Sequence, residues 1–298
     1  RIRRWRIGEE AGLRALTQSA LLDFYRTWYQ PSNTILSVVG DVNVEMVRRE
    51  VEARYGALEA RTVPRVAGPT EDTFSGFRAR EWSGDIAQQQ LAFGWRAPNM
   101  THADTPALDL LGVALGTGRA SRLYRAVRDR QLATSASAWH YTAGDVGVFV
   151  LHAEAPAAQA KAAALQMWRE VQAVRHVGFR ASEVTRAQRI MESRWLRRLE
   201  SMDGQATYLA SWEAEGGLER AAAYYDRLLT LDAQALRDVA ERHLDPAQVS
   251  VVSYRPDGAD ALADDREALY DALQRVASLG SSVMAPPEMP TPIESPAI

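Results

Sequence analysis

Cysteine is missing from all 298 residues of the sequence. This absence excludes disulfide bonds, thiolate catalysis and cysteine-based zinc sites, but it leaves the compartment open because cysteine-free proteins occur everywhere. No apolar run approaches the roughly 20 residues that a membrane-spanning helix needs. The formal net charge is only -3, with both signs mixed along the chain. We therefore expect neither a nucleic-acid partner nor a membrane span.

Histidine is scarce, which limits the metal sites that the chain can build. Two loose pairs of a histidine and a carboxylate are candidates: His102 with Asp104, and His152 with Glu154. Either pair would need a third ligand at a suitable spacing to hold zinc, and none is evident. The sequence therefore predicts no metal ligand and no catalytic residue in this chain.

What is present is an ordinary globular composition, with 46% hydrophobic and 24% charged residues. Residues 17–29 have apolar side chains at helical spacing behind a Thr17 cap, and Pro31 ends that helix. Ile35 to Val39 is a short β-branched run that predicts a strand, and Val44 to Tyr55 is again helical. This order is typical of the end of an α/β domain.

A stretch rich in Pro and Gly follows, and we interpret residues 63–75 as a linker. The patterns beyond it predict two strands, two helices, a β-hairpin and four further helices. These elements are expected at Phe77 to Trp82, Gln88 to Trp95, 104–116, 119–131, 133–142 with 146–153 (turning at 143–145), 157–175, 181–200, 202–215 and 219–229.

An internal repeat organises the chain. Residues 236–252 match residues 21–39 when Pro246 is aligned with Pro31, an offset of 215 residues. Both copies read as a helix, a proline stop and a strand, which indicates a duplicated domain of about 200 residues. We therefore expect residues 1–62 to be the C-terminal end of a first domain, 76–278 a complete second domain, and 279–298 a Pro-rich tail or linker. The start, which has neither Met nor a signal core, reads as a piece of something longer.

Two segments resemble a known family. Residues 24–58, FYRTWYQPSNTILSVVGDVNVEMVRREVEARYGAL, are similar to the segment that closes the first domain of pitrilysin/insulinase-type zinc peptidases, which include the mitochondrial processing peptidases. Residues 116–139 resemble the Gly-rich turn, helix and strand of the family's second domain. The resemblance implies an α+β fold of duplicated α/β sandwich domains, with one complete domain and the C-terminal end of a preceding one. In the family, two pairs of such domains form a clamshell around a peptide chamber.

The resemblance also implies where the chemistry lies. These peptidases bind zinc through His-X-X-Glu-His and a downstream Glu, and this sequence contains no such motif. We therefore expect this chain to be the non-zinc portion of a peptidase that cleaves unfolded peptides, and to be inert alone. Zinc is expected in the full-length protein or in a partner. The expected partners are a peptide substrate and a second peptidase half or dimer partner, and the family resemblance points to the periplasm. The alternative is a non-catalytic scaffold or partner subunit of a peptidase-like complex.

Arg128 is the candidate substrate-binding residue. It stands where the family has the Arg of an Arg and Tyr pair that reaches the substrate carbonyl, but Ser135 and Thr134 occupy the positions where the Tyr is expected. The alternative is that Arg122 to Arg130 form a solvated, charged helix face.

Two other features of the sequence also have alternative interpretations. Gly116-Thr-Gly118 reads as a helix connector more readily than as a phosphate loop. The tryptophans could line a peptide-binding chamber or pack in the core and at domain interfaces. They include Trp28, Trp82, Trp95, Trp139 and Trp212.

Overall fold

The computed structural model describes residues 7–64, 76–142 and 146–280. Its N-terminal segment contains the helices α1 (Glu10–Arg14), α2 (Gln18–Trp28) and α3 (Val44–Tyr55). The Thr17 hydroxyl accepts a hydrogen bond from the Ala20 N–H and caps α2, as the sequence predicts. Both predicted helices of this segment are therefore confirmed.

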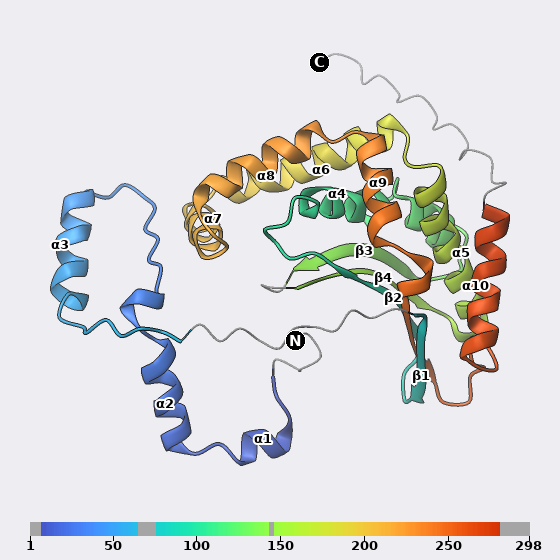
Figure 1. The fold of residues 1–298 in the computed structure, drawn as a ribbon, viewed down its shortest axis with the longest axis horizontal. Coiled ribbons are helices and arrows are strands. Elements are labelled where there is room, and N and C mark those ends of the chain that lie inside the picture. The colour runs from blue at the N-terminus through green and yellow to red at the C-terminus, as the bar shows by residue number, and fades with distance from the viewer. Residues whose placement is uncertain (1–6, 65–75, 143–145, 281–298) are drawn as a thin grey trace.

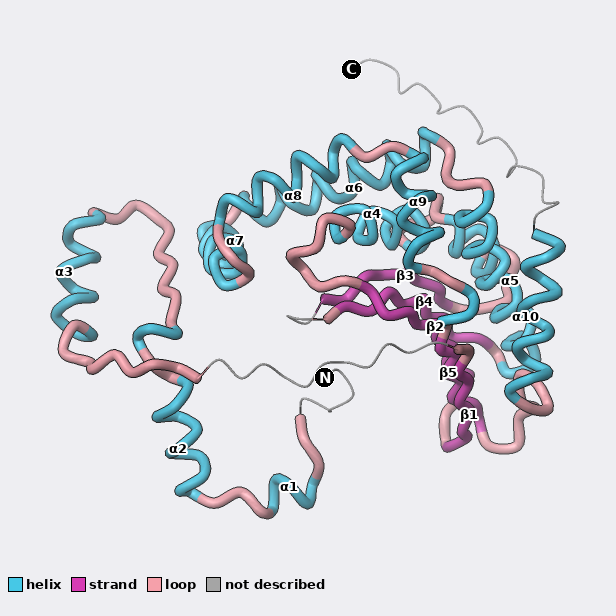
Figure 2. The backbone as a smooth tube through the Cα atoms, viewed as in Figure 1, coloured by secondary structure: helices cyan, strands magenta, loops and turns pink. Residues whose placement is uncertain are grey.

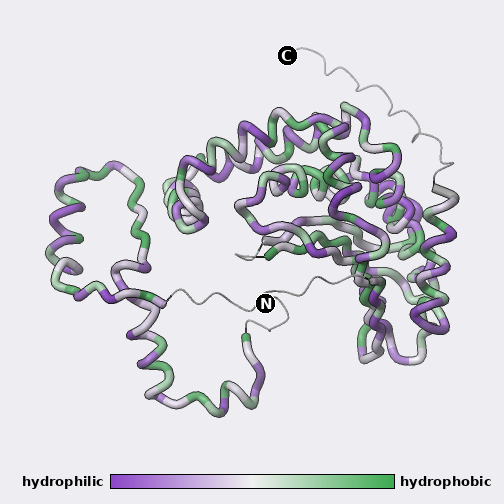
Figure 3. Tube along the Cα trace, viewed as in Figure 1, coloured by the Kyte–Doolittle hydropathy of each residue, from purple (hydrophilic) through white to green (hydrophobic). Residues whose placement is uncertain are grey.

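The strand predicted at Ile35 to Val39 is wrong for this structure, because these residues form neither helix nor strand. A strand needs a neighbour to satisfy its backbone hydrogen bonds, and none of the described residues supplies one here. The helices α1, α2 and α3 likewise contain no buried residue. Figure 3 shows hydrophobic positions recurring along this segment, and Phe24 is 57% exposed.

The second part of the chain is built on a five-stranded sheet of order β1-β5-β2-β4-β3. Strands β1 and β5 are parallel, and the other neighbouring pairs are antiparallel. β-branched and aromatic residues, which favour strands, are most frequent in β3, β4 and β5. They span Arg78–Gly84 (β1), Gln89–Ala97 (β2), Ser135–Thr142 (β3), Gly147–Ala155 (β4) and Ser250–Pro256 (β5).

Helices gather on one side of this sheet, as Figures 1 and 2 show. The helices α4, α5, α9 and α10 pack on the strands, while α6, α7 and α8 form an outer layer. Each predicted helix between residues 157 and 229 is present. The bounds are Thr105–Gly116 (α4), Ala157–His176 (α5), Ala181–Leu199 (α6), Met202–Ala214 (α7), Leu218–Thr230 (α8), Ala233–His243 (α9) and Arg266–Gly280 (α10).

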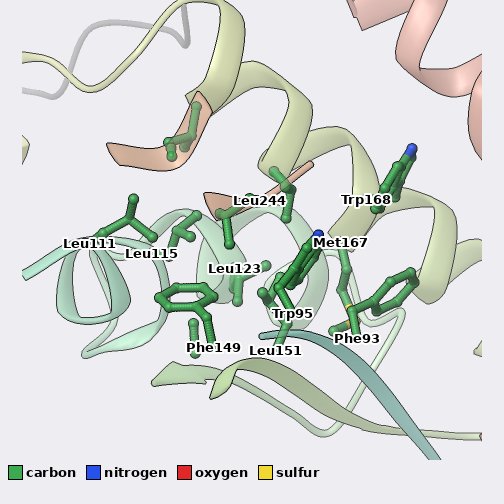
Figure 4. Close-up of a cluster of buried hydrophobic side chains, with 14 of the residues drawn as sticks. Phe93, Trp95, Leu111, Leu115, Leu123, Phe149, Leu151, Met167, Trp168 and Leu244 are labelled. Carbon is green, nitrogen blue, oxygen red and sulfur yellow. The ribbon is translucent and has the colours of Figure 1, made fainter. Parts of the chain in front are cut away.

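Strict alternation along β2 places the hydrophobic core on the helix side of the sheet. Leu91, Phe93 and Trp95 are buried, while the residues between them face the other side. The Trp95 ring stacks on Trp168 of α5 with centroids 6.2 Å apart, and Figure 4 shows both rings within the cluster. Trp95 is thus a core residue and not part of a chamber wall.

Helix α4 approaches β3 unusually closely because its facing positions are glycines. A Cβ atom at Gly116 would lie 2.1 Å from the Ala138 backbone nitrogen, and one at Gly112 would lie 3.1 Å from the Trp139 Cα. Since these neighbours are backbone atoms of a hydrogen-bonded strand, they have little freedom to move. Gly116 therefore allows α4 to pack closely on β3. Residues 116–118 are accordingly a connector and not a phosphate loop.

The internal repeat has a counterpart in the structure. Helix α9 lies 215 residues after α2 at both of its ends, and the 3₁₀ turn η3 (Pro246–Gln248) lies 215 residues after η1 (Pro31–Asn33). The caps correspond too, since Asp232 accepts from the Ala235 N–H as Thr17 accepts from Ala20. In the second copy, the strand β5 follows and pairs with both β1 and β2.

The α+β fold class is confirmed, and one predicted helix differs from expectation. The helix predicted at 119–131 is reduced to the π-helical turn η2 (Tyr124–Arg128) and its flanking turns, because the chain must reverse within a few residues to enter β3. The predicted linker falls mostly on residues 65–75, which lie outside the described ranges, as do residues 143–145 and 281–298.

Candidate functional site

The side of the sheet opposite the helices is the candidate functional site, and we call it the open face. None of its side chains is buried, in contrast to the fully buried positions that alternate with them on β2 and β4. All five strands contribute. The open face consists of Arg78, Arg80 and Trp82 (β1), Ser250, Val252 and Tyr254 (β5), Gln90, Ala92, Gly94 and Arg96 (β2), Val148, Val150, His152 and Glu154 (β4), and Ser135, Ser137, Trp139 and Tyr141 (β3).

Aromatic rings gather at the two ends of the open face. Near one edge, Trp82 packs against Tyr254 with centroids 5.5 Å apart, and the Arg80 guanidinium lies 5.8 Å from the Trp82 ring centre. Near the other edge, Trp139 lies 6.3 Å from His152 and is 41% exposed. Exposed rings flanked by polar groups are typical of surfaces that bind other chains. The sequence named Trp82 and Trp139 without separating them from the core tryptophans.

His152 and Glu154 lie on the same face of β4, as their spacing predicts, but they do not form a metal site. The His152 Nε2 atom is 2.9 Å from the Gln90 Oε1 atom, so the imidazole takes part in a cross-strand hydrogen bond. No group of three His, Asp or Glu side chains in the described ranges is arranged to hold a metal ion. The residues described here therefore do not fit a catalytic zinc.

The second predicted pair, His102 and Asp104, gains a third member from a distant element. His243 of α9 places its Nε2 atom 2.7 Å from the Asp104 carboxylate, and the Arg242 Nε atom is 3.5 Å from the same oxygen. The His102 Nδ1 atom accepts a hydrogen bond from the Asp104 N–H. This cluster joins the start of α4 to the end of α9, so it has a structural explanation, and no local sequence signal marked His243 as its member.

Arg128 is exposed, and its guanidinium lies 4.9 Å from the centre of the Tyr124 ring. Arg122, six residues earlier, behaves differently. It is only 7% exposed and forms two hydrogen bonds of 2.9 and 2.8 Å with the Glu183 carboxylate, and a third to the Gly178 carbonyl oxygen. The expected solvated face is therefore wrong for Arg122, whose charge is paired in the interior, whereas Arg128 is exposed.

A partly buried polar network that the sequence did not reveal ties α4, α8 and β3 to the residue that follows β2. The Tyr224 hydroxyl of α8 donates to the Asp109 carboxylate of α4 at 2.5 Å, and the His140 Nδ1 atom of β3 lies 2.9 Å from the other carboxylate oxygen. The His140 Nε2 atom is 3.2 Å from the Pro98 carbonyl oxygen. Burial, together with the charge of Asp109, raises the pKa of Tyr224 well above its usual value. The tyrosine therefore stays protonated and acts as a structural donor.

Comparison with known proteins identifies the class to which this fold belongs. The family description "Peptidase M16 inactive domain" matches residues 15–191. Zinc protease PqqE of Helicobacter pylori is 25% identical over 241 residues, which cover 78% of this chain and 54% of that protein. A mitochondrial-processing peptidase subunit, alpha-2 of Dictyostelium discoideum, is 25% identical over 72% of this chain and 47% of its own length.

Solved structures agree with this assignment. The crystal structure of a protease from Helicobacter pylori superposes with a TM-score of 0.73 at 25% identity, over 84% of this chain and 62% of that one. The periplasmic protease PqqL from Escherichia coli shares the fold, with a TM-score of 0.71 at 16% identity, over 98% of this chain and 34% of its own.

The chain belongs to the peptidase M16 family, the pitrilysin/insulinase type that the sequence indicated. In particular, it carries the inactive domain of zinc protease-like proteins. The chain spans about half the length of the curated relatives it matches. Among the helices in the described ranges, none combines the length and apolarity that a membrane crossing requires.

Proposed function

We propose that this chain is the non-zinc portion of a zinc-dependent peptidase that cleaves unfolded peptides, and that its open face forms one wall of the substrate chamber. The observation that carries the proposal is the one-sided sheet, with Trp139 and Tyr141 exposed at one edge and Trp82 at the other. An extended peptide offers apolar side chains and backbone groups, and exposed rings beside polar side chains suit both. The chain by itself is then inert.

The proposal includes a domain assignment. Residues 1–62 form the end of a preceding, zinc-type domain, 63–75 a linker, 76–278 the complete second domain, and 279–298 a tail or linker. The correspondence of α2 and η1 with α9 and η3 supports this division. By the same offset, residues 35–39 occupy the place of β5, which lies between two strands. The preceding domain then supplies the sheet that pairs with them and covers the exposed side chains of α2.

Zinc, in this proposal, is held by that preceding domain or by a partner subunit, because the described residues do not fit it. Names of the relatives support two further parts of the proposal. Processing-peptidase subunits, by their name, work as parts of an assembly, so we propose a second peptidase half or a dimer partner. A periplasmic location is proposed on the likeness to PqqL. The peptide substrate is shared between the halves.

The direct test is to measure zinc content and peptide cleavage for this chain and for the longer protein that contains it. We expect zinc at one ion per chain and hydrolysis of a quenched, unstructured peptide for the longer protein, and neither for the 298-residue chain, because only the former holds a ligand set. If the longer protein also lacks both zinc and cleavage, the scaffold alternative replaces this proposal. Zinc-dependent cleavage by the 298-residue chain would refute it outright.

The role of the open face and of Arg128 is tested in the longer protein with the same peptide. We expect Trp139→Ala to raise KM about fivefold with kcat nearly unchanged, because an exposed ring contributes roughly 1 kcal/mol to binding. Arg128→Ala, which removes the proposed contact to the substrate carbonyl, should raise KM by a similar factor. Arg189→Ala, an exposed arginine on α6, is the control. Unchanged KM in either test variant would remove that residue from the substrate site.

A further inference from the structure

A pocket of about 260 Å³ lies away from the open face, between the loop that follows β2 and the helices α7 and α8. Its lining includes Met100, Ala103 and Pro106, from the loop and the start of α4, and Trp212 and Ala223, from α7 and α8. None of the comparisons assigns a role to this place. Its volume exceeds that of a single large side chain, so a small organic group can enter it.

The base of the pocket is aromatic and offers no free hydroxyl. Trp212 is 8% exposed, and its ring lies 5.4 Å from that of Tyr224. The Tyr224 hydroxyl is already engaged, since it donates to Asp109 at 2.5 Å. Tyr224 therefore contributes its ring and not its hydroxyl to a ligand. This part of the pocket favours an apolar group.

The rim carries an excess of positive charge, with two arginines and one glutamate in the lining. The Arg227 side chain has no ion pair or hydrogen bond among the described residues. The Arg220 Nε atom donates to the Gly216 carbonyl oxygen, which leaves its two terminal nitrogens available. Glu215 is the one acidic residue of the lining. Two guanidinium groups over an apolar base are complementary to an anion attached to an apolar body.

His102 adds a neutral donor to the same lining. Its Nδ1 atom accepts the Asp104 N–H at 3.0 Å, so in this arrangement the ring proton resides on Nε2. The pocket therefore combines an apolar base with three donor side chains, of which two are permanently charged.

We propose that this pocket binds an apolar group that carries a carboxylate, with the C-terminal residue of a peptide as the source. The apolar side chain lies against Trp212, and the carboxylate meets Arg220 and Arg227 at the rim. Recognition of the carboxylate stands on the pocket alone, whereas the peptide source rests on the proposed peptidase function. A free apolar acid is the other source of the same chemistry.

The test is a titration of the protein followed by NMR, with the Trp212 indole N–H signal assigned by Trp212→Phe. The probes are N-acetyl-Leu-Phe, its C-terminal amide, and 3-phenylpropionate. We expect the peptide acid to shift the Trp212 signal saturably and the amide to bind at least tenfold more weakly, because it lacks the charge that the guanidinium groups recognise. Zinc and cleavage are not needed, so this result is independent of the peptidase assay.

Variants locate the site. Arg227→Gln and Arg220→Gln should each weaken binding of the peptide acid roughly 10-fold or more, and Ala223→Trp should abolish it by filling the pocket. Arg189→Gln, an exposed arginine outside the lining, is the matched control. Equal affinity for acid and amide, or no loss in Arg227→Gln, would overturn the proposal. Tighter binding of 3-phenylpropionate than of the peptide would keep the carboxylate site and reject the peptide as its source.

Discussion

Replacing Gly116 by alanine is expected to destabilise the second domain by about 2 kcal/mol. The new Cβ atom would lie 2.1 Å from the Ala138 nitrogen and 2.8 Å from the Ser137 carbonyl carbon. Overpacking against a backbone that cannot yield costs about 3 kcal/mol, and the higher helix propensity of alanine offsets about 1 kcal/mol of this. The helix α4 must therefore move off β3. Urea unfolding followed by circular dichroism measures the loss.

Three Gly→Ala substitutions at different distances from their neighbours test whether the close contact between α4 and β3 causes the loss of stability. Gly112→Ala should cost less than Gly116→Ala, because its nearest neighbour, the Trp139 Cα, is 3.1 Å away. Gly94→Ala on β2 is the control, since its Cβ would meet only the Ser250 carbonyl oxygen, at 4.0 Å. We expect its stability to stay within about 0.5 kcal/mol of the wild type. Equal effects of all three substitutions would show that helix and strand contact is not the cause.

Breaking the Arg122 and Glu183 pair is expected to have the other large effect. Arg122→Met leaves the Glu183 carboxylate in the interior without its partner, a change that typically costs about 3–5 kcal/mol. The double variant Arg122→Met with Glu183→Leu should recover most of that loss, because no unpaired charge then remains. Arg128→Met, on the exposed side of the same turn, should change stability by about 0.5 kcal/mol or less. A double variant as unstable as Arg122→Met would contradict this account.

The same pair predicts a pH dependence. Burial by itself raises the pKa of Glu183, but the hydrogen bonds and charge of Arg122 and the Arg180 N–H outweigh it, so the pKa is lowered. A carboxyl group with a lowered folded-state pKa stabilises the fold above its unfolded pKa, and this stability is lost as the pH falls through the folded value. We therefore expect the stability gap between wild type and Arg122→Met to narrow below the ordinary carboxyl pKa. A stability difference that stays constant on acidification would argue against a contribution of Glu183 ionisation to this pair.

Local patterns in the sequence predicted the elements because each is set by near neighbours. Thr17 caps α2 through a residue three positions away, and the period of two along β2 places Leu91 and Phe93 on one side. The repeat was visible for the same reason, since a helix, a proline turn and a strand leave a continuous signature. The absence of His-X-X-Glu-His and the family resemblance were also visible in the sequence, because both depend on contiguous motifs.

Other features depend on residues that the chain brings together from afar. The strand expected at residues 35–39 is not formed, because strand formation requires a partner as well as a favourable composition. The sequence placed Arg122 in a solvated run of charges, yet its guanidinium is buried and hydrogen-bonded to Glu183, which lies 61 residues away. The period of two groups Trp95 with Leu91 and Phe93, but only the packing of the helices shows that this side of the sheet is buried and that the side of Trp139 is open.

The sequence by itself determined most of the helices and strands and the repeat, because these follow from spacing and residue type along the chain. The family followed from its motifs, and the α+β class from the family resemblance. The tertiary structure decided which face of the sheet stays uncovered, which arginine is buried, and where Trp212, Arg220 and Arg227 come together around a pocket. These depend on the order and packing of elements far apart in the sequence, so the physical reason is the same in each case: burial and charge pairing are properties of neighbours in space.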